Sequence, residues 1–359
     1  MQRILIVDDS VAFRNQVAEA LRNVPDIEIV GAVANGKLAL ARLLESPVDI
    51  AIVDLEMPEM NGLELLEAIT LHKILVKTIF FASQTKSSAL SSLKALNRGA
   101  FDFVIKPKAD LDESKPRISI AESIRQVLLP KIKIGEFTKP SVVEIKNVPP
   151  AFDLINWQIF VPKAIVIGSS TGGPTALEKL FDRFGSVPIC PIFIAQHMPP
   201  IFTAMLSERL SAISGLRVAE GVDGEVVTAN RIYVAPGNFH MTLKTENNIV
   251  KIVLDQHEQR HSVRPAVDHL FESAAQIYKN YLLGVILTGM GEDGRDGAVA
   301  IKKAHGAMII QNQASCVVYG MPRAVYNSGA YDRQTDLEGI KDVLQRYSDL
   351  GRLSLRKAT

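Results

Sequence analysis

Short apolar runs alternate with amphipathic segments along residues 3–106. Five of these runs, RILIV, IEIVGAV, DIAIVD, TIFFAS and DFVIK, have the length and the β-branched content of buried strands. The segments between them have helical spacing; Phe13, Val17, Leu21 and Val24, for example, fall on one face of a helix. This alternation predicts a five-stranded parallel sheet with helices on both sides.

The same alternation returns from Lys163 onward. The apolar runs AIVIG, PIFIAQH, RIYVAP, LLGVILTG and AMIIQ are separated by segments with helical spacing. Two further runs, HMTLK and IVKIVLD, flank the turn residues Glu246-Asn247-Asn248, which predicts a β-hairpin added to a mostly parallel sheet. The predicted fold class is therefore α/β, with a doubly wound domain in each half.

The periodic pattern fades between the two halves. The last helical pattern of the first half covers Ile118–Leu129. Prolines then interrupt the sequence at positions 130, 140, 149, 150 and 162. We predict domains at residues 1–130 and 162–350, joined by a linker over residues 131–161.

Composition narrows the class of protein. The 359 residues, 47% of them hydrophobic, are enough for two buried cores, and 40 Lys and Arg nearly balance 39 Asp and Glu. This balance gives no basic field that points to nucleic acid.

Cys190 and Cys316 lie in apolar surroundings without metal-ligand spacing, which is typical of thiols in a reducing compartment. With no secretory pattern, and no apolar run near the roughly 18 residues of a membrane span, we expect a cytoplasmic protein that is not inserted in a membrane.

A strand runs into a turn of glycines and hydroxyls at Ala164–Thr175, AIVIGSSTGGPT. Its segment Gly168–Gly172 has the G-x-S-x-G spacing, in which small neighbours permit a sharp turn that leaves the central hydroxyl exposed. Ser170 is therefore a candidate nucleophile. The alternative on this stretch alone is a tight or phosphate-binding strand-to-helix turn. The stretch lacks the complete P-loop and dinucleotide-binding motifs.

Two more candidates follow strands of the same half. His197 closes PIFIAQH, and Asp293 lies in GMGEDG after GVILTG, so both belong at the carboxyl ends of strands with Ser170. A serine nucleophile needs a general base, and the base needs an acid to orient it. Taken singly, the histidine suits a strand cap and the aspartate a turn or helix N-cap. Pairing Asp293 with the late His305 would restore the usual hydrolase order, but His305 precedes Gly306 at a predicted helix end and is the poorer choice.

Charged residues also end strands of the first half. Asp8 and Asp9 follow its first strand, Asp54 its third and Lys106 its fifth. Three carboxylates at one sheet edge repel each other unless a cation lies between them, and oxygen ligands suit Mg²⁺. A solvated strand end is the alternative for each residue alone, whereas the set of four favours a site.

Residues 1–106 resemble the receiver domain of two-component response regulators. The resemblance rests on DD near the N-terminus, DLEMPEMNG around Asp54, and KP after the fifth strand. It implies that Asp54 accepts a phosphoryl group from a histidine kinase and that Lys106 pairs with the phosphoryl oxygens. It also implies a Mg²⁺ site formed by the carboxylates of Asp8, Asp9 and Asp54 and the backbone carbonyl of Glu56.

The fourth strand of the first half departs from this pattern. Receivers usually carry Ser or Thr at its end to hydrogen-bond the phosphoryl group, and here Ala82 stands in that place with Ser83 next to it. Because successive strand residues point to opposite faces, Ser83 can sense the phosphoryl group only where the strand end is irregular. Ser83 is the residue predicted for this role, together with Lys106.

The chain from Lys163 to about residue 347 resembles the catalytic domain of the bacterial chemotaxis methylesterases, the family of protein-glutamate methylesterase/glutamine deamidases. The matching runs, in order, are GSSTGGP, AQHMPP, IYVAPG, GVILTGMGEDG and QNQASCVVYGMPRAV. The resemblance implies hydrolysis of glutamate methyl esters on the cytoplasmic helices of chemoreceptors, with release of methanol. It further implies deamidation of glutamines at the same sites, and no cofactor in this domain.

The resemblance also assigns roles to residues of this domain. Ser170 attacks the ester carbonyl, His197 takes and returns the proton, and Asp293 orients the imidazole. The backbone N–H of Met290, with Thr171 nearby, stabilises the oxyanion.

The sequence therefore predicts a phosphorylation-activated esterase of chemotaxis adaptation. Its predicted partners are the cytoplasmic helices of methyl-accepting chemoreceptors and the chemotaxis histidine kinase that phosphorylates Asp54. A prediction from another class stays open: a non-catalytic output module that binds a partner protein when phosphorylated, with Ser170 as a structural turn residue.

Overall fold

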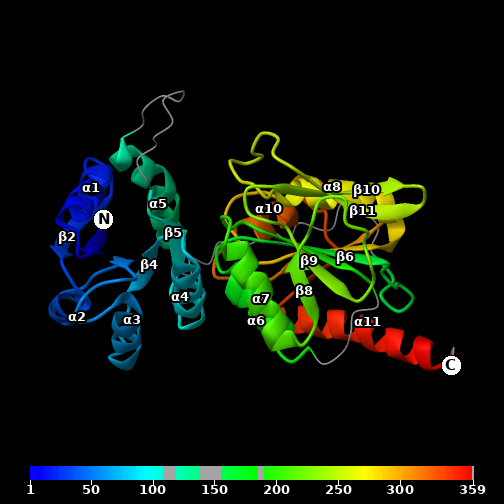
Figure 1. Cartoon of the computed structure of the whole chain (residues 1–359), viewed down its shortest axis with the longest axis horizontal. Helices are drawn as coiled ribbons and strands as arrows, with labels where there is room; N and C mark the ends of the chain where they lie inside the picture. Colours follow the sequence, from blue (N-terminus) through cyan, green and yellow to red (C-terminus); the bar gives the residue numbers. More distant parts are fainter. Residues whose placement is uncertain (108–118, 138–151, 153–154, 185–189, 358–359) are drawn as a thin grey trace. The chain divides into compact units, whose positions relative to one another are not determined.

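The computed structural model describes residues 1–107, 119–137, 152, 155–184 and 190–357. The chain forms two compact units, Met1–Val143 and Glu144–Thr359, each built on a parallel sheet (Figure 1). Much of the predicted linker over residues 131–161 lies outside the described residues. The predicted domain limits at residues 130 and 162 therefore stay predictions.

The sheet of the first unit has five parallel strands in the order β2-β1-β3-β4-β5, as predicted. The chain pairs β1 with β2 on one side and then continues with β3 on the other, so the strand order reverses between β1 and β3. Ligand sites of such sheets lie at the carboxyl ends of the strands, beside this reversal. The strands are β1 (Gln2–Val7), β2 (Ile27–Val33), β3 (Ile50–Asp54), β4 (Lys77–Ala82) and β5 (Asp102–Ile105).

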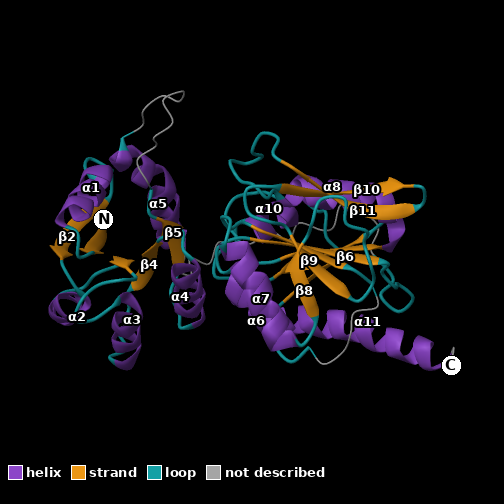
Figure 2. Ribbon diagram, viewed as in Figure 1, coloured by secondary structure: helices purple, strands orange, loops and turns teal. Residues whose placement is uncertain are grey.

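Helices cover both faces of this sheet. One layer contains α1 and α5, and the other contains α2, α3 and α4 (Figure 2). The first four helices begin at polar residues whose side chains accept an N–H of the first turn, which satisfies donors that a helix start leaves unpaired. The helices are α1 (Val11–Leu21), α2 (Gly36–Glu45), α3 (Gly62–Leu71), α4 (Lys86–Asn97) and α5 (Ile120–Phe137).

Helix α5 is longer than the sequence pattern predicts. The fading periodicity after Pro130 predicts a linker from residue 131, whereas the helix continues to Phe137 with the proline inside it. A proline in a helix removes one backbone hydrogen bond. Leu128 and Ile132, on either side of it, are almost completely buried, so packing holds the helix together through this position.

The main sheet of the second unit has seven parallel strands in the order β14-β13-β12-β6-β7-β9-β8. Its central strands are buried along their whole length, as expected of a parallel sheet covered on both faces. The strand order reverses between β6 and β12. The strands are β6 (Ala164–Ser169), β7 (Ile192–Gln196), β8 (Arg217–Glu220), β9 (Arg231–Val234), β12 (Leu282–Ile286), β13 (Ala307–Gln311) and β14 (Arg333–Thr335).

The helices of this unit form two layers. Helices α8, α9 and α10 pack together, and α6 packs against both α7 and α11 on the opposite side of the sheet (Figure 2). They are α6 (Gly173–Phe181), α7 (Phe202–Ser214), α8 (Val267–Tyr278), α9 (Arg295–Lys303), α10 (Met321–Ser328) and α11 (Leu337–Lys357), with short 3₁₀ turns at Lys279–Tyr281 and Gln313–Ser315.

The predicted hairpin is present but does not extend the main sheet. Strands β10 (His240–Glu246) and β11 (Ile249–Asp255) pair with each other as a separate two-stranded antiparallel sheet. The hairpin lies beside α8, where Leu243 N–H donates to Ser273 Oγ, and its Met241 and Ile252 are fully buried (Figure 1). Its apolar face is therefore covered by a helix, which the strand pattern alone does not reveal.

A buried ion pair ties three segments of the second unit together. Lys302 Nζ of α9 lies 2.6 Å from Asp332 Oδ1, and both side chains are at most 1% exposed. The same carboxylate accepts the backbone N–H of Met308 in β13 and of Ile155, far upstream in the sequence. The pair therefore attaches the segment before β6 to the core of the unit.

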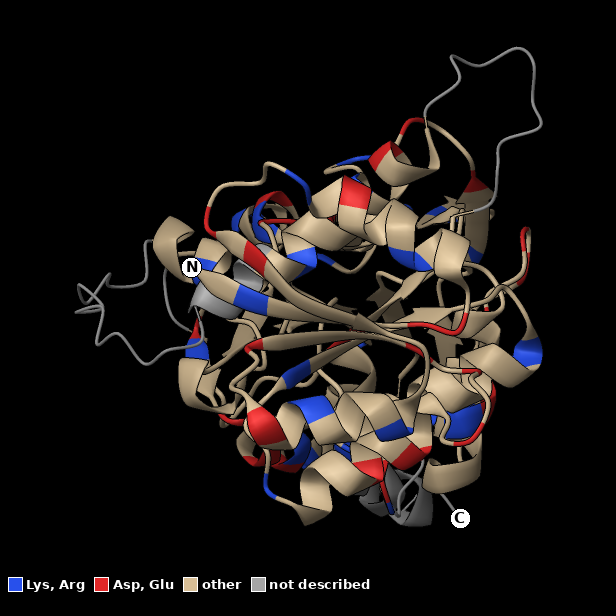
Figure 3. Ribbon diagram, turned by 90° about the vertical axis from the view of Figure 1, so that its left-hand side faces the viewer, with Lys and Arg blue, Asp and Glu red and all other residues tan. Residues whose placement is uncertain are grey.

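Charged residues of both signs are interspersed along the ribbon, as Figure 3 shows for the side of the molecule that it presents. This agrees with the near balance of 40 basic and 39 acidic residues. Within the described ranges, the helices fall short of the combined length and apolarity that crossing a bilayer requires.

We expect Asp332→Asn to lower the free energy of unfolding of the second unit by about 3 kcal/mol. The substitution leaves the buried Lys302 ammonium beside a neutral partner, while the shape of the side chain is kept. Trp157 is the single tryptophan of the chain and belongs to this unit. Urea unfolding followed by tryptophan fluorescence therefore measures the change.

Glu246→Gln is the matched control, because it neutralises a partner of Lys244 and Lys251 on the exposed hairpin. Solvent screens such a pair, so its unfolding midpoint should equal that of the wild type. An Asp332→Asn midpoint that also equals the wild-type value would contradict the prediction.

Candidate functional site

The three acidic residues predicted at the edge of the first sheet do meet there. Asp8 and Asp9 follow β1, and Asp54 ends β3, the strand paired with β1. One carboxylate oxygen of each residue lies within 4.8 Å of the other two. Asp8 and Asp54 are buried and Asp9 is exposed, so the cluster opens to solvent on the side of Asp9.

Lys106, directly after β5, joins this cluster. Its Nζ lies 2.8 Å from Asp8 Oδ2 and 2.7 Å from Asp54 Oδ2, and its ammonium also sits over the ring of Phe13. Burial raises the pKa of Asp54 above its ordinary value, although the hydrogen bond and charge of Lys106 act in the opposite direction. The charge of Asp8 raises this pKa further. One lysine therefore only partly offsets the negative charge of the cluster.

Glu56 and Ser83 lie near this cluster in sequence but differ in their contacts. The backbone N–H of Glu56 hydrogen-bonds the carboxyl of Asp54, and its side chain is exposed. The hydroxyl of Ser83 lies 3.2 Å from that of Thr85, the N-cap residue of α4. Ala82 is the last residue of β4. The role of Ser83 in sensing a phosphoryl group stays a prediction.

In the second unit, strand register brings Ser170 and His197 together. Ser169 pairs with Gln196 in the parallel strands β6 and β7, and Ser170 and His197 are the next residue of each strand. The backbone N–H of His197 donates to Ser169 O at 3.1 Å. The side-chain amide of Gln196 donates to the carbonyls of both Ser170 and His197. The two candidate residues therefore leave adjacent strands side by side.

Asp293 reaches the same edge from β12, the other neighbour of β6. Its Oδ2 lies 2.7 Å from His197 Nε2, and the two side chains are 2% and 10% exposed. Because an ionised carboxylate only accepts hydrogen bonds, Nε2 carries the proton and Nδ1 of the neutral ring is left as the acceptor. The structure thus brings together the predicted base and acid, with a defined tautomer.

The carboxylate of Asp293 is held by backbone donors as well. Val267 N–H donates to Oδ2, and Asp268 N–H and Gly294 N–H donate to Oδ1, at 2.7, 3.0 and 2.9 Å. Burial opposes ionisation, but the hydrogen bond from His197 and these N–H groups hold the pKa of Asp293 below its ordinary value. Two of the donors open helix α8, whose N-terminus favours negative charge. Asp293 is therefore ionised at neutral pH.

The turn around Ser170 differs from the expected one. Ser170 is 8% exposed rather than open to solvent, and the left-handed residue is Gly172, with φ of +79°. A Cβ on Gly168 would lie 2.4 Å from Val267 Cγ1, so this glycine serves the close packing of α8 on β6. Among the described residues, Ser170 Oγ has no hydrogen-bond partner, so its bond to His197 is not formed here.

Met290 and Thr171 lie on facing loops. Gly289, before Met290, donates its N–H to Val318 O and accepts from Gly320 and Met321. Thr288 Oγ1 donates to Thr171 O at 3.0 Å, which links this loop to the turn of Ser170. In the described part of the chain the N–H of Met290 makes no protein hydrogen bond, so it is available to a ligand. Its role as an oxyanion donor stays a prediction.

Comparison with known proteins agrees with the two-unit organisation. Residues 165–344 match the family model of the CheB methylesterases, and residues 4–114 match that of the response regulator receiver domain. The protein-glutamate methylesterase/protein-glutamine glutaminase of Trichodesmium erythraeum is 39% identical over 96% of this chain and 98% of its own. The chain belongs to the CheB methylesterase family.

A relative and a solved structure, both from Thermotoga maritima, are also similar to this chain. The protein-glutamate methylesterase/protein-glutamine glutaminase of that organism is 37% identical over 92% of this chain and 94% of its own length. The crystal structure of its CheB methylesterase catalytic domain is 42% identical, covers 52% of this chain and 98% of the crystallised one, and has a TM-score of 0.49.

Two residues of this CheB-family site were not found from the sequence. Gln196 is fully buried in β7, where Ser169 Oγ donates to its Oε1 at 2.6 Å. A polar residue at the end of an apolar strand, just before a candidate base, is the available signal. Asp268 is fully buried beside Asp293, and only its place just after Pro265, at the start of a segment with helical spacing, could have indicated it.

We expect Lys106→Met to raise the pKa of Asp54 further, because it removes the hydrogen bond and the positive charge that oppose burial and the repulsion from Asp8. A ¹³C NMR titration of the Asp54 carboxyl carbon in metal-free buffer measures this pKa. Lys77→Met is the control, since Lys77 lies at the amino end of β4, away from the cluster. An Asp54 titration that is identical in Lys106→Met and wild type would contradict the expectation.

Proposed function

We propose that this protein hydrolyses glutamate methyl esters on the cytoplasmic helices of chemoreceptors and deamidates glutamines at the same sites. The observation that carries the proposal is the 2.7 Å bond between His197 and Asp293 at the strand ends beside Ser170. The names of relatives 39% and 37% identical over 96% and 92% of the chain support the substrate. The expected location is the cytoplasm, where those receptor helices lie.

The proposed reaction uses Ser170 as nucleophile and His197 as base. Ser170 Oγ attacks the ester carbonyl carbon, and its proton passes to His197 Nδ1, the ring nitrogen that Asp293 leaves free. Nδ1 then gives this proton to the methoxy oxygen as the C–O bond breaks, which releases methanol and leaves an acyl ester on Ser170. Water, deprotonated by the same nitrogen, attacks that ester, and the proton returns from Nδ1 to Ser170 Oγ as its bond to the acyl carbon breaks, which frees the glutamate side chain. Deamidation follows the same steps with ammonia as the leaving group.

The missing hydrogen bond between Ser170 and His197 fits this scheme. Catalytic hydrogen bonds are often long without substrate and shorten in the complex. Asp293 holds the imidazole through a buried contact, so the Ser170 side chain is the part that moves to complete the arrangement. The free N–H of Met290, with Thr171 on the facing loop, would then receive the negative charge that develops on the carbonyl oxygen.

In the first unit, we infer that Asp54 accepts a phosphoryl group from a chemotaxis histidine kinase. The carboxylates of Asp8, Asp9 and Asp54 offer oxygens within 4.8 Å of one another, and their charge is only partly offset by Lys106, which fits Mg²⁺. The carbonyl of Glu56 would complete this set. Bound there, Mg²⁺ supplies the neutralisation of charge that phosphoryl transfer requires. Because Lys106 Nζ contacts Asp54, it can pair with the oxygens of a phosphoryl group on that residue.

We expect Ser170→Ala to lower the rate of methanol release from methylated receptor membranes by about 10⁴-fold or more. His197→Gln should lower it by a similar factor, because the two residues act as one unit. Trp157 fluorescence checks that each variant is folded. Ser328→Ala is the matched control: its hydroxyl donates to Val325 O at the end of α10, and its rate should equal that of the wild type.

This experiment distinguishes an esterase from a non-catalytic module that binds a partner protein. A partner-binding output module would release no methanol in any variant, and Ser170→Ala would keep its partner. Methanol release by Ser170→Ala at the wild-type rate would rule out Ser170 as the nucleophile.

We further expect Asp54→Asn to abolish the stimulation of methanol release by a small acyl phosphate in the presence of Mg²⁺, because the amide cannot accept the phosphoryl group. Chelation of Mg²⁺ should abolish the same stimulation in the wild type. Asp49→Asn is the control, since Asp49 contacts Arg3 N–H at the amino end of the sheet. Stimulation that persists in Asp54→Asn would place phosphorylation at another residue.

A further inference from the structure

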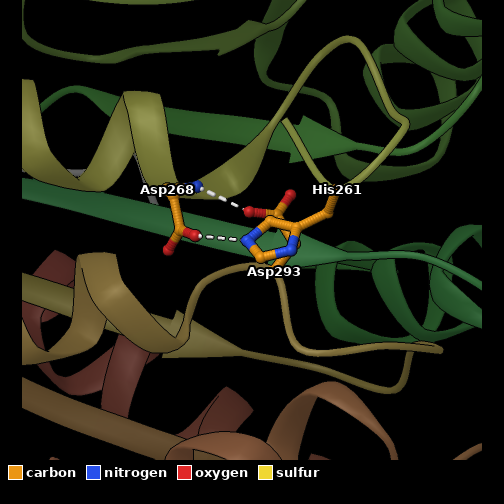
Figure 4. Close-up of side chains that lie close together, drawn as sticks. All are labelled: His261, Asp268 and Asp293. Carbon is orange, nitrogen blue, oxygen red and sulfur yellow. Dashed lines mark hydrogen bonds and ion pairs between the residues drawn. The ribbon is translucent and has the colours of Figure 1, made fainter. Parts of the chain in front are cut away.

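A second buried carboxylate lies beside Asp293 of the proposed triad. Asp268, in the first turn of α8, is fully buried, and its carboxylate lies within 4.8 Å of that of Asp293 and of a His261 ring nitrogen. Figure 4 shows these three side chains pointing toward one another. Two acids buried this close repel each other, so the arrangement needs compensation and calls for a reason.

Hydrogen bonds to Asp268 and Asp293 connect the starts of helices α8 and α9. Asp293, in the loop before α9, accepts the N–H groups of Val267 and Asp268 that open α8. Asp268, in the first turn of α8, accepts the N–H of Gly297 in the first turn of α9 at 2.7 Å. The start of α8 therefore donates to Asp293 from the loop before α9, and the start of α9 donates to Asp268 from α8. This exchange fixes the loop of Asp293 against α8, and with it the oxygen that orients His197.

The other oxygen of Asp268 faces two basic side chains. His261 Nε2 lies 3.0 Å from Oδ2 and Arg260 Nε lies 3.4 Å from it. Arg260 also pairs with Glu272 of α8 and Asp296 of α9, which are more exposed. The charged groups around Asp268 are thus Asp293 from the β12–α9 loop, Arg260 and His261 from the loop before α8, Glu272 from α8 itself, and Arg295 and Asp296 from α9.

The surroundings of the two acids shift their pKa values in opposite directions. Four donors keep Asp293 ionised, whereas burial first, and then the charge of Asp293, raise the pKa of Asp268. When Asp268 is ionised, its negative charge lies within 4.8 Å of the carboxylate that contacts His197. Such a charge favours the imidazolium that His197 becomes during catalysis.

We propose that Asp268 is a positioning residue of this esterase. It fixes Asp293 through the reciprocal hydrogen bonds between the starts of α8 and α9, and it places a second negative charge within 4.8 Å of the carboxylate that contacts His197. The inference rests on the proposed function. It adds that the strength of the base depends on a residue that does not contact His197 in the described structure.

The test compares the pH dependence of kcat/KM for Asp268→Asn and wild type, with a receptor cytoplasmic fragment carrying radiolabelled glutamate methyl esters. Asn keeps an acceptor for Gly297 N–H and removes the charge. We expect kcat to fall about 10-fold and the acidic limb of the profile to move to lower pH by about half a unit, since the imidazolium loses a supporting charge. A folded variant with the wild-type kcat and profile would overturn the proposal.

Two more variants keep the test decisive. Glu272→Gln makes the same chemical change one turn further along α8, on a carboxylate that is 34% exposed, and should leave the profile where it is. Arg260→Gln removes the cation beside Asp268, which changes both the ionisation of Asp268 and the positive charge near the pair, so the acidic limb should move. Where Asp268→Asn does not fold, an acidic limb that stays in place in Arg260→Gln would overturn the proposal.

The failures of the two proposals are distinguishable. A wild type that releases no methanol contradicts the esterase function itself. A wild type that releases methanol and loses this activity in Ser170→Ala, combined with an unchanged profile in Asp268→Asn, contradicts only the role of Asp268.

Discussion

The carboxylate of Asp293 is the interaction on which the candidate active site depends. It receives hydrogen bonds from His197, from two N–H groups at the start of α8 and from Gly294. A buried carboxylate is costly unless its oxygens are satisfied, and here each oxygen has two donors. The same four bonds that stabilise the charge also fix the imidazole, the helix and the loop relative to one another. The bonds that stabilise the buried Asp293 carboxylate therefore also orient His197, the proposed base.

Both units use the reversal point of a parallel sheet, but they leave different charge states there. In the first unit, three carboxylates share one lysine, and burial first, and then the charge of Asp8, raise the pKa of Asp54. In the second unit, backbone donors and helix starts satisfy Asp293 within the protein. The first arrangement suits a site that takes up a cation and a phosphoryl group. The second suits a fixed acid that stays ionised through a reaction cycle.

Strand pattern predicts the placement of the candidate residues because parallel strands deliver their carboxyl ends to one edge. Apolar runs that end in Asp8, Asp54, Lys106, Ser170 and His197 were enough to predict which residues meet, and the structure brings the charged ones and the His–Asp pair into contact. The family resemblance, which the comparisons confirm, added the substrate. The catalytic roles themselves stay predictions.

What the pattern missed depends on packing between distant segments. Helix α5 passes Pro130 because its neighbours Leu128 and Ile132 are buried, and the hairpin stays separate because α8 covers it. Gly168 appears in a nucleophile motif, yet the space that it leaves is filled by Val267. In each case the local sequence pattern suggests one structure, and contacts with a distant segment of the chain produce a different one.

Asp268 shows why such partners matter for chemistry as well as for fold. A single buried acid could orient His197, and a second one within 4.8 Å raises the electrostatic energy of the folded chain. The repulsion is reduced by Gly297 N–H, Arg260 and His261, which contact Asp268 and not Asp293. Burial and the charge of Asp293 raise the pKa of Asp268, and these contacts oppose that rise, whereas the donors around Asp293 hold its pKa low enough to keep it ionised. Of the two acids, the one that contacts His197 is therefore the one whose surroundings favour the ionised form.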